Sequence, residues 1–204
     1  MMRRSVGYSV VGYLVRGLAT LMFAVGTFCS TGGTAAADDA AVQFVQKMTR
    51  ELIAANRAGA DVVFADTLRR NAHVGAIGTY ALGSYQTQLS QQNRDSYLNG
   101  MVRFISRYAA TESNKYQVSH VQVTGPSRLV NSGVMVDTKV HMRDGSTYDV
   151  QWLLQAAGAG YRVRDAKVQV LLGEYWMTPF LKDLFEKYIA ENGSVNALVL
   201  ALNR

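Results

Sequence analysis

Cysteine and proline are scarce in this sequence, with one cysteine and two prolines among 204 residues. The scarcity of proline, together with 18 glycines that follow no fixed period, excludes a proline-rich linker and a collagen-like repeat. Hydrophobic residues make up 49% of the chain and charged residues 18%, which excludes an intrinsically disordered protein. A chain of this length buries one sizeable core, and we expect a single domain.

Clustered charge is also absent, although the formal net charge is +6. Three of the 21 basic side chains lie within the first 37 residues, which contain no acid, so the rest of the chain has a net charge of +3. These remaining basic residues are scattered, and Arg69-Arg70 is their only adjacent pair. Nucleic-acid binding requires a basic patch or stripe, so the sequence argues against a nucleic-acid partner.

The N-terminal segment has the pattern of a secretory signal peptide. Basic residues precede an apolar run over residues 17–28 that is too short to span a bilayer, and three alanines at residues 35–37 supply a small-residue cleavage site. An uncleaved membrane anchor is the alternative, because residues 10–15 add a further apolar stretch. The residues before Cys29 fit a lipoprotein cleavage site poorly.

Cleavage after Ala37 would leave a mature chain, residues 38–204, without cysteine. This composition excludes disulfides, thiol catalysis and thiolate metal ligands. No later hydrophobic run reaches the length that spans a bilayer. We therefore predict a signal peptide over residues 1–37 and a soluble periplasmic domain over residues 38–204.

Hydrophobic periodicity predicts four helices in the first half of that domain. Apolar residues recur at helical spacing over residues 41–57, 61–70, 74–85 and 90–108, although three glycines weaken the third helix. The fourth is the strongest, because Ser90 is a suitable N-cap. Its apolar face consists of Tyr97, Met101, Phe104, Ile105 and Tyr108.

After residue 115 the hydrophobic period changes from that of a helix to that of a strand. We predict four antiparallel strands over residues 118–123, 130–142, 148–154 and 161–172, with a β-bulge near Asp165-Ala166 that reconciles the opposite parity of the apolar residues on its two sides. Thr178-Pro179 and Ser194 then have the pattern of two C-terminal helix starts. The predicted fold is α+β, a curved four-stranded antiparallel sheet wrapped by N- and C-terminal helices that encloses an apolar pocket.

Motifs for catalysis or metal binding are lacking. The only histidines are His73, His120 and His141, and although the last two would face each other across neighbouring strands, further zinc ligands are missing. G-x-S-x-G, H-E-x-x-H, P-loop and G-x-G-x-x-G patterns do not occur. We therefore predict no metal and no cofactor.

Three aspartates on the predicted strands are candidates for acid–base chemistry. Strand alternation places Asp137 and Asp149 opposite their apolar neighbours, on the solvent side. We interpret Asp165, beside the bulge, as a structural partner of Arg162 or Arg164. The many large apolar side chains are consistent with a lipid pocket, but a dry core of this size needs similar material.

Several motifs resemble those of the MlaC family, the toluene-tolerance family of periplasmic phospholipid carriers. Leu82-Gly83-Ser84-Tyr85 is similar to the family's L-G-x-Y, and residues 90–97 are similar to [ST]-x-x-Q-R-x-x-[FY], with Asn93 in place of the glutamine. Residues 161–165 resemble W-x-[IV]-x-D, and Asn192-Gly193 with the apolar segment 197–202 resembles the family's C-terminal end. The G-V-S triplet that is common after the strand aspartate is missing, so a hopanoid-like lipid stands beside a phospholipid as ligand.

The resemblance implies a lipid carrier without catalytic activity. Such a carrier shuttles lipid between an outer-membrane lipoprotein complex and an inner-membrane ABC transporter through its MCE-domain partner, in either direction. The alternative is a secreted small-ligand binder or an isomerase-like enzyme on a cone-shaped α+β fold. Such an enzyme needs an acid and a donor such as Tyr148 or Tyr161 deep inside its cavity.

We expect the lipid pocket between one face of the sheet and the third and fourth helices. Tyr175, Trp176 and Phe180, at the start of the penultimate helix, would either gate this pocket or close the bottom of the core. The predicted lipid-binding residues are Tyr80, Tyr85, Met101, Ile105, Val136, Val140, Val150, Trp152, Val168, Val170, Trp176 and Phe180.

Overall fold

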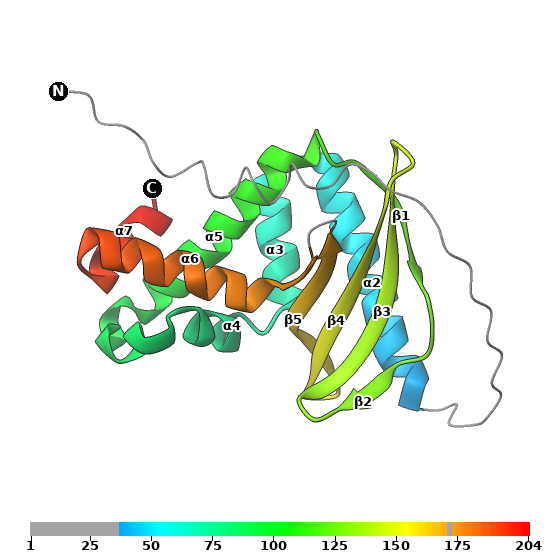
Figure 1. Cartoon of the computed structure of the whole chain (residues 1–204), viewed down its shortest axis with the longest axis horizontal. Coiled ribbons are helices and arrows are strands. Elements are labelled where there is room, and N and C mark those ends of the chain that lie inside the picture. Colours follow the sequence, from blue (N-terminus) through cyan, green and yellow to red (C-terminus); the bar gives the residue numbers. More distant parts are fainter. Residues whose placement is uncertain (1–36, 171–172) are drawn as a thin grey trace.

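The computed structural model describes residues 37–170 and 173–204, so the predicted signal peptide lies outside the described residues except for Ala37. Helices come first, then a sheet, then two more helices (Figure 1). The first group is α2 (Ala37–Ala58), α3 (Asp61–Asn71), α4 (Val74–Ala81), the 3₁₀ helices η2 (Gly83–Gln88) and η3 (Gln91–Asn93), and α5 (Arg94–Ser113). The strands are β1 (Val118–Val123), β2 (Arg128–Val130), β3 (Gly133–Met142), β4 (Thr147–Ala157), β5 (Gly160–Val170) and β6 (Gly173–Trp176), followed by α6 (Met177–Asn192) and α7 (Val195–Leu202).

The helix predicted over residues 74–85 ends earlier than its hydrophobic pattern suggests. Its first part is α4, whose N-cap is His73, and the ring of His73 accepts a hydrogen bond from the backbone N–H of Ala76. Gly83 follows with φ at +52°, a left-handed conformation that an α-helix does not continue through. The chain proceeds as the 3₁₀ helix η2, and Ser90 then caps η3 directly before α5.

All six strands form one antiparallel sheet in the order β1-β3-β4-β5-β6, with β2 also paired to β3. The α+β architecture with an antiparallel sheet is as predicted, but the expected number of four strands is wrong. The segment 130–142 is broken by a turn at residues 131–132, between the end of β2 at Val130 and the start of β3 at Gly133, which has a φ of +145°. The short strand β6 was also missed, because four residues give too little alternation to reveal a strand.

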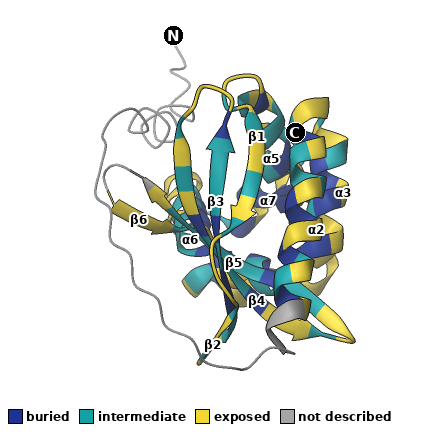
Figure 2. Ribbon diagram, turned by 90° about the vertical axis from the view of Figure 1, so that its right-hand side faces the viewer, coloured by how far each residue is buried: buried dark blue, intermediate teal, exposed yellow. Residues whose placement is uncertain are grey.

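Apolar side chains gather in two separate clusters. The sheet core lies between α2, which covers one face of the sheet, and strands β3, β4 and β5 (Figures 1 and 2). The helical core lies among α4, α5, α6 and α7, beside the sheet (Figure 1). The buried members of the sheet core are Ala41, Val45, Met48, Val136, Leu154 and Val163. Those of the helical core include Ala81, Leu82, Tyr97, Met101, Leu181, Phe185, Ile189, Leu198 and Leu202.

Within the described residues, helices long and apolar enough to cross a membrane are lacking.

Candidate functional site

A cleft of about 620 Å³ opens where the elements of the helical core meet strand β5. We call it the cationic cleft, because three of its lining residues are Arg94, Arg164 and Lys182. These side chains come from the first turn of α5, from β5 and from the first half of α6. The other lining residues, from the start of α4 to η2, are His73, Gly75, Ala76, Thr79, Tyr80, Gly83 and Gln86.

One wall of the cleft is fixed by the connection between α3 and α4. The backbone N–H of His73 donates to the carbonyl of Val163 on β5 at 2.8 Å, and Ala72 forms a parallel bridge with the same residue. The Arg162 guanidinium donates to the carbonyls of Arg69 and Ala72, at the C-terminal end of α3. Backbone hydrogen bonds thus hold the start of α4 against the sheet at the position of the cleft.

Arg164 reaches the cleft because strand β5 contains a β-bulge. Leu154 pairs with Val163 and Leu153 pairs with Asp165, so Arg164 is the extra residue without a partner of its own on β4. The bulge was predicted near Asp165-Ala166, and the register places it at the neighbouring Arg164. An extra residue of this kind redirects a side chain out of the regular alternation, and the redirected side chain here lines the cleft.

Asp165 fixes the beginning of α6 against β5. One carboxylate oxygen accepts hydrogen bonds from the backbone N–H groups of Ala166 at 2.8 Å and Thr178 at 2.9 Å. The predicted pairing of Asp165 with an arginine is therefore wrong. The expected N-cap at Thr178 is also wrong, because α6 begins at Met177. Thr178 is the second residue of the helix, and its backbone N–H donates to Asp165.

The family-like motif Leu82-Gly83-Ser84-Tyr85 borders the cleft through Gly83, and close packing explains why this position is a glycine. A side chain on Gly83 would overlap the carboxylate of Glu186, which approaches the backbone closely there. Glu186 Oε1 accepts from the backbone N–H of Ser84 at 3.0 Å and from its hydroxyl at 3.2 Å, while Lys182 Nζ donates to Oε2 at 3.0 Å. These contacts join η2 to α6.

The charges of Lys182 and Glu186 offset each other. The backbone N–H of Ser84 and then the Lys182 ammonium hold the pKa of Glu186 below its usual range. The Glu186 carboxylate in turn raises the pKa of Lys182. Among the described residues, the side chains of Arg94 and Arg164 have no hydrogen-bond or ion-pair partner, and none of the ten cleft-lining residues is an acid. The cleft is therefore suited to a negatively charged group.

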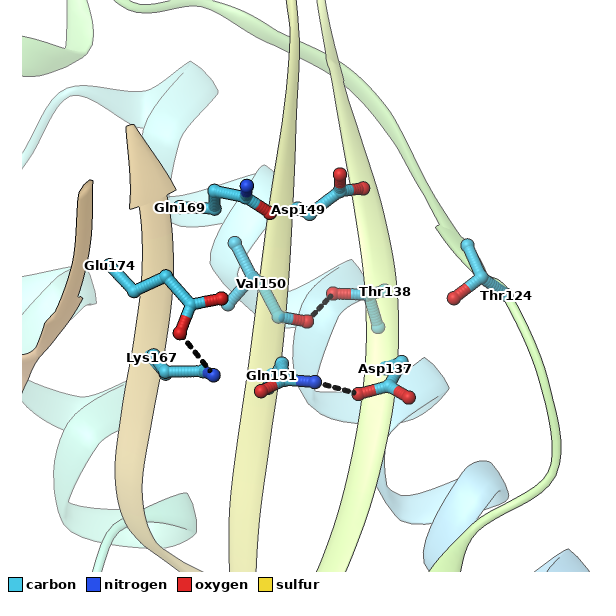
Figure 3. Close-up of a pocket in the computed structure, with 9 residues that line it drawn as sticks. All are labelled: Thr124, Asp137, Thr138, Asp149, Val150, Gln151, Lys167, Gln169 and Glu174. Atoms are coloured by element: carbon cyan, nitrogen blue, oxygen red, sulfur yellow. Dashed lines mark hydrogen bonds and ion pairs between the residues drawn. The ribbon is translucent and has the colours of Figure 1, made fainter. Parts of the chain in front are cut away.

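A second hollow, of about 270 Å³, lies on the sheet face opposite α2, and its polar groups are largely paired (Figure 3). Gln151 donates to Asp137 at 2.8 Å and Lys167 pairs with Glu174 at 2.7 Å. Asp137 also accepts from Arg128. Since its charged groups already have partners, this hollow is a solvated strand surface, and Asp149 is exposed there as predicted.

His120 and His141 do face each other across neighbouring strands, as the sequence predicts. They are paired residues of β1 and β3, and their rings stack with centroids 4.1 Å apart. Within the described residues, groups of three or more side chains able to hold a metal ion are lacking.

The predicted lipid-binding residues fall into two groups. Met101 is 1% exposed in the helical core, and Ile105 and Tyr85 are partly buried and pack against that core. Val136 is fully buried in the sheet core and Trp152 packs against it, donating its indole N–H to the Thr138 hydroxyl at 3.0 Å. The structure thus places the two predicted walls in different apolar clusters.

The remaining predicted residues lie between or beside these clusters. Tyr80 is 45% exposed and lines the cationic cleft. Val150 and Val168 pair across β4 and β5 on the same face of the sheet as Trp152. Val140 lies on that face of β3 as well, four residues after Val136. Trp176 and Phe180 are half-buried where β6 meets α6, and the side chain of Val170 lies outside the described residues.

Sequence reasoning missed the cationic residues of the cleft. Arg94 lies inside one family-like motif and Arg164 inside another, but the motifs did not indicate that either residue lines a binding site. Lys182 lies outside the motifs, and no sequence pattern singled it out. The three are far apart in the sequence, and only the folding of α5, β5 and α6 brings them together.

Comparisons with known proteins agree with this architecture. The sequence model of one protein family, described as MlaC protein, matches residues 38–203. A solved structure with a similar fold is a phospholipid-binding protein from Ralstonia solanacearum in complex with a phospholipid. The two structures align with a TM-score of 0.63 and 19% sequence identity, over 80% of this chain and 94% of the other. Curated proteins gave no match to this sequence.

Proposed function

The chain belongs to the MlaC family, as its sequence motifs predict, and from this membership and the cationic cleft we propose that it is a phospholipid-binding carrier. The phospholipid complex of the structural neighbour supports this ligand class. The observation that carries the proposal is the position of the cleft. It opens where α4, α5 and α6, which carry the helical core, meet strand β5, which contributes Val163 to the sheet core. Its lining has positive charge and an exposed tyrosine, which suits a ligand that is both apolar and anionic.

In this proposal the headgroup occupies the cleft and the acyl chains lie between the helical core and the sheet. The predicted residues Val140, Val150, Trp152 and Val168 provide the sheet side of that space, and Trp176 and Phe180 lie at its edge. The cleft volume of about 620 Å³ is typical of a small-molecule site, and in this proposal the headgroup occupies it. The acyl chains need further space between the helical core and the sheet. We therefore propose that the two cores move apart to accommodate the chains.

The energetics of such a carrier favour exchange over one-way delivery. Each methylene buried from water contributes ~0.8 kcal/mol, so two acyl chains would exceed the roughly 18–21 kcal/mol ceiling of non-covalent affinity if water were the reference state. A lipid that leaves a bilayer passes from one apolar environment to another, so its net transfer free energy is small. The carrier provides a path, and its partners set the direction.

We further propose that residues 38–204 act in the periplasm after removal of the signal peptide. The route would connect an outer-membrane lipoprotein complex with an inner-membrane ABC transporter that carries an MCE domain. A phospholipid is the first choice of cargo, and a hopanoid-like lipid the second. This proposal rests on the family and on the N-terminal sequence pattern.

An isomerase-like enzyme finds little support in the side chains of the fold. Asp165, the neighbour of the lining residue Arg164 on β5, is engaged by two backbone N–H groups and holds α6 in place. Tyr161 packs against Phe44 in the sheet core, with ring centroids 6.3 Å apart. Neither residue is placed as a donor or acid inside a cavity, so binding describes these residues better than catalysis.

Native mass spectrometry of the purified protein, before and after solvent extraction, tests the proposal. We expect a mass shift equal to one lipid that disappears on extraction and returns when the empty protein is incubated with phospholipid vesicles. A folded protein that stays empty after purification and after incubation with vesicles would show that the proposal is wrong.

A further inference from the structure

The charges that line the cationic cleft are unbalanced. A phosphodiester headgroup carries one negative charge, whereas the cleft contains Arg94 and Arg164, both without an acidic partner among the described residues. The third cation, Lys182, already has Glu186 at 3.0 Å. One phosphate would therefore leave about one positive charge of the cleft uncompensated.

A zwitterionic headgroup would add a further cation to this environment. The ten lining residues include no carboxylate, so the ammonium group of phosphatidylethanolamine would find no acid among them. Glu186, the ion-pair partner of Lys182, accepts from Ser84 and Lys182 with its two oxygens. Like charges brought close in a partly enclosed site are unfavourable, and the ammonium would meet two arginines.

The fold positions these two arginines by independent means. Arg164 is the extra residue of a β-bulge, and bulges commonly redirect side chains toward functional sites. Arg94 is the first residue of α5, directly after the 3₁₀ turn that Ser90 caps. Guanidinium groups bind phosphate oxygens in a bidentate geometry, which a lysine cannot reproduce.

We propose that the cationic cleft selects phospholipids with a net negative charge, such as phosphatidylglycerol, over zwitterionic phospholipids, through Arg94 and Arg164. This inference rests on the proposed function and adds the ligand class. The arginines would recognise a phosphate group in either a lipid headgroup or free phosphate, and we assign it to the headgroup of a lipid.

The test is competitive loading of the full mature chain, emptied of lipid, from vesicles that contain equal amounts of phosphatidylglycerol and phosphatidylethanolamine. The bound lipids are counted by native mass spectrometry for the wild type, Arg94→Gln, Arg164→Gln and the control Arg50→Gln, which removes an exposed arginine of α2 outside the cleft. Circular dichroism confirms that each variant is folded. A parallel titration of the empty protein uses inorganic phosphate alone.

We expect the wild type and Arg50→Gln to prefer the anionic lipid. Each cleft variant should keep its total lipid loading but lose roughly fivefold of that preference, which is the scale of one charge-assisted hydrogen bond in a partly exposed site. Equal loading of both lipids by the wild type would overturn the inference and leave the carrier function intact. An unchanged preference in both cleft variants would overturn the assignment to these arginines. Tight binding of inorganic phosphate without a lipid preference would also overturn it, and failure to load either lipid would overturn the carrier function itself.

Discussion

Single residues in this protein connect elements that are far apart in the sequence. Gly83 lets the backbone turn with positive φ and lets Glu186 of α6 approach the start of η2. Ser84 then donates two hydrogen bonds to that carboxylate. The glycine of the L-G-x-Y motif is therefore required both by its own conformation and by the packing of another helix.

The substitution Gly83→Ala tests this dual requirement. An alanine would be held in a left-handed conformation and its Cβ would displace the Glu186 carboxylate, so we expect a loss of about 1–3 kcal/mol in the free energy of unfolding. Chemical denaturation followed by circular dichroism measures this loss.

Gly125→Ala is the matched control, because a Cβ at that position meets nothing within 4 Å and the residue does not have positive φ. We expect a change within about 0.5 kcal/mol for the control. If the two variants were equally stable, the close contact between Gly83 and Glu186 would have no energetic role.

At the scale of secondary-structure elements, the bulge of β5 has two consequences. It brings Arg164 to the cleft, and it allows Asp165 to reach the first turn of α6. Thr178, which receives this hydrogen bond, is only 4% exposed, so water cannot replace Asp165 as a partner for its N–H group. The aspartate of the family-like strand motif is thus a structural link between the sheet and the helical core.

Replacement of Asp165 by alanine would leave that buried N–H group without an acceptor. We expect Asp165→Ala to lower the free energy of unfolding by about 1–3 kcal/mol, and Asp165→Asn, whose amide oxygen still accepts, to lower it by less. Asp66→Ala serves as the control, because its ion pair with Arg69 is exposed and 3.5 Å long. Equal losses for the alanine and asparagine variants would contradict the capping role.

The outcome at this scale also shows how far the sequence could predict the fold. Periodicity located the long helices and strands because each buries one face over several turns or residues, as Tyr97 and Met101 do in α5. The opposite parity of the apolar residues in the two halves of the predicted strand 161–172 also indicated the bulge in β5. The start of α6 was misassigned because its cap comes from Asp165, 13 residues earlier, and local pattern carries no record of such a contact. The cleft was missed for the same reason.

At the scale of the whole molecule, the division into two apolar cores is the feature most relevant to lipid carriage. A single close-packed core would have to be disrupted to admit acyl chains, whereas chains can enter between two cores that keep their own packing. Met101 in the helical core and Val136 in the sheet core each stay buried by contacts within their own cluster. The sequence predicted these two residues as opposite walls of one pocket, but could not indicate that each packs within its own cluster.

The position of the acyl chains can be tested with the two tryptophans of the sequence, Trp152 on the sheet face and Trp176 at the start of α6. Bromine atoms on an acyl chain quench tryptophan fluorescence at contact distance. In the variant Trp176→Phe, which retains Trp152, we expect loading with a phospholipid brominated near the middle of its chains to quench emission, because the chains would lie against Val150, Trp152 and Val168. The variant Trp152→Phe reports on Trp176 in the same way.

The control is the same lipid without bromine, loaded to the same occupancy as measured by native mass spectrometry. Because the indole of Trp152 donates to Thr138, whose hydroxyl in turn donates to the carbonyl of Val150, this side chain is held in one orientation and reports on a defined part of the sheet. Quenching in both variants would place the chains between the sheet and α6. Unchanged emission from both tryptophans at full lipid occupancy would mean that the chains lie elsewhere, and that the two cores do not separate along the face of β4 and β5.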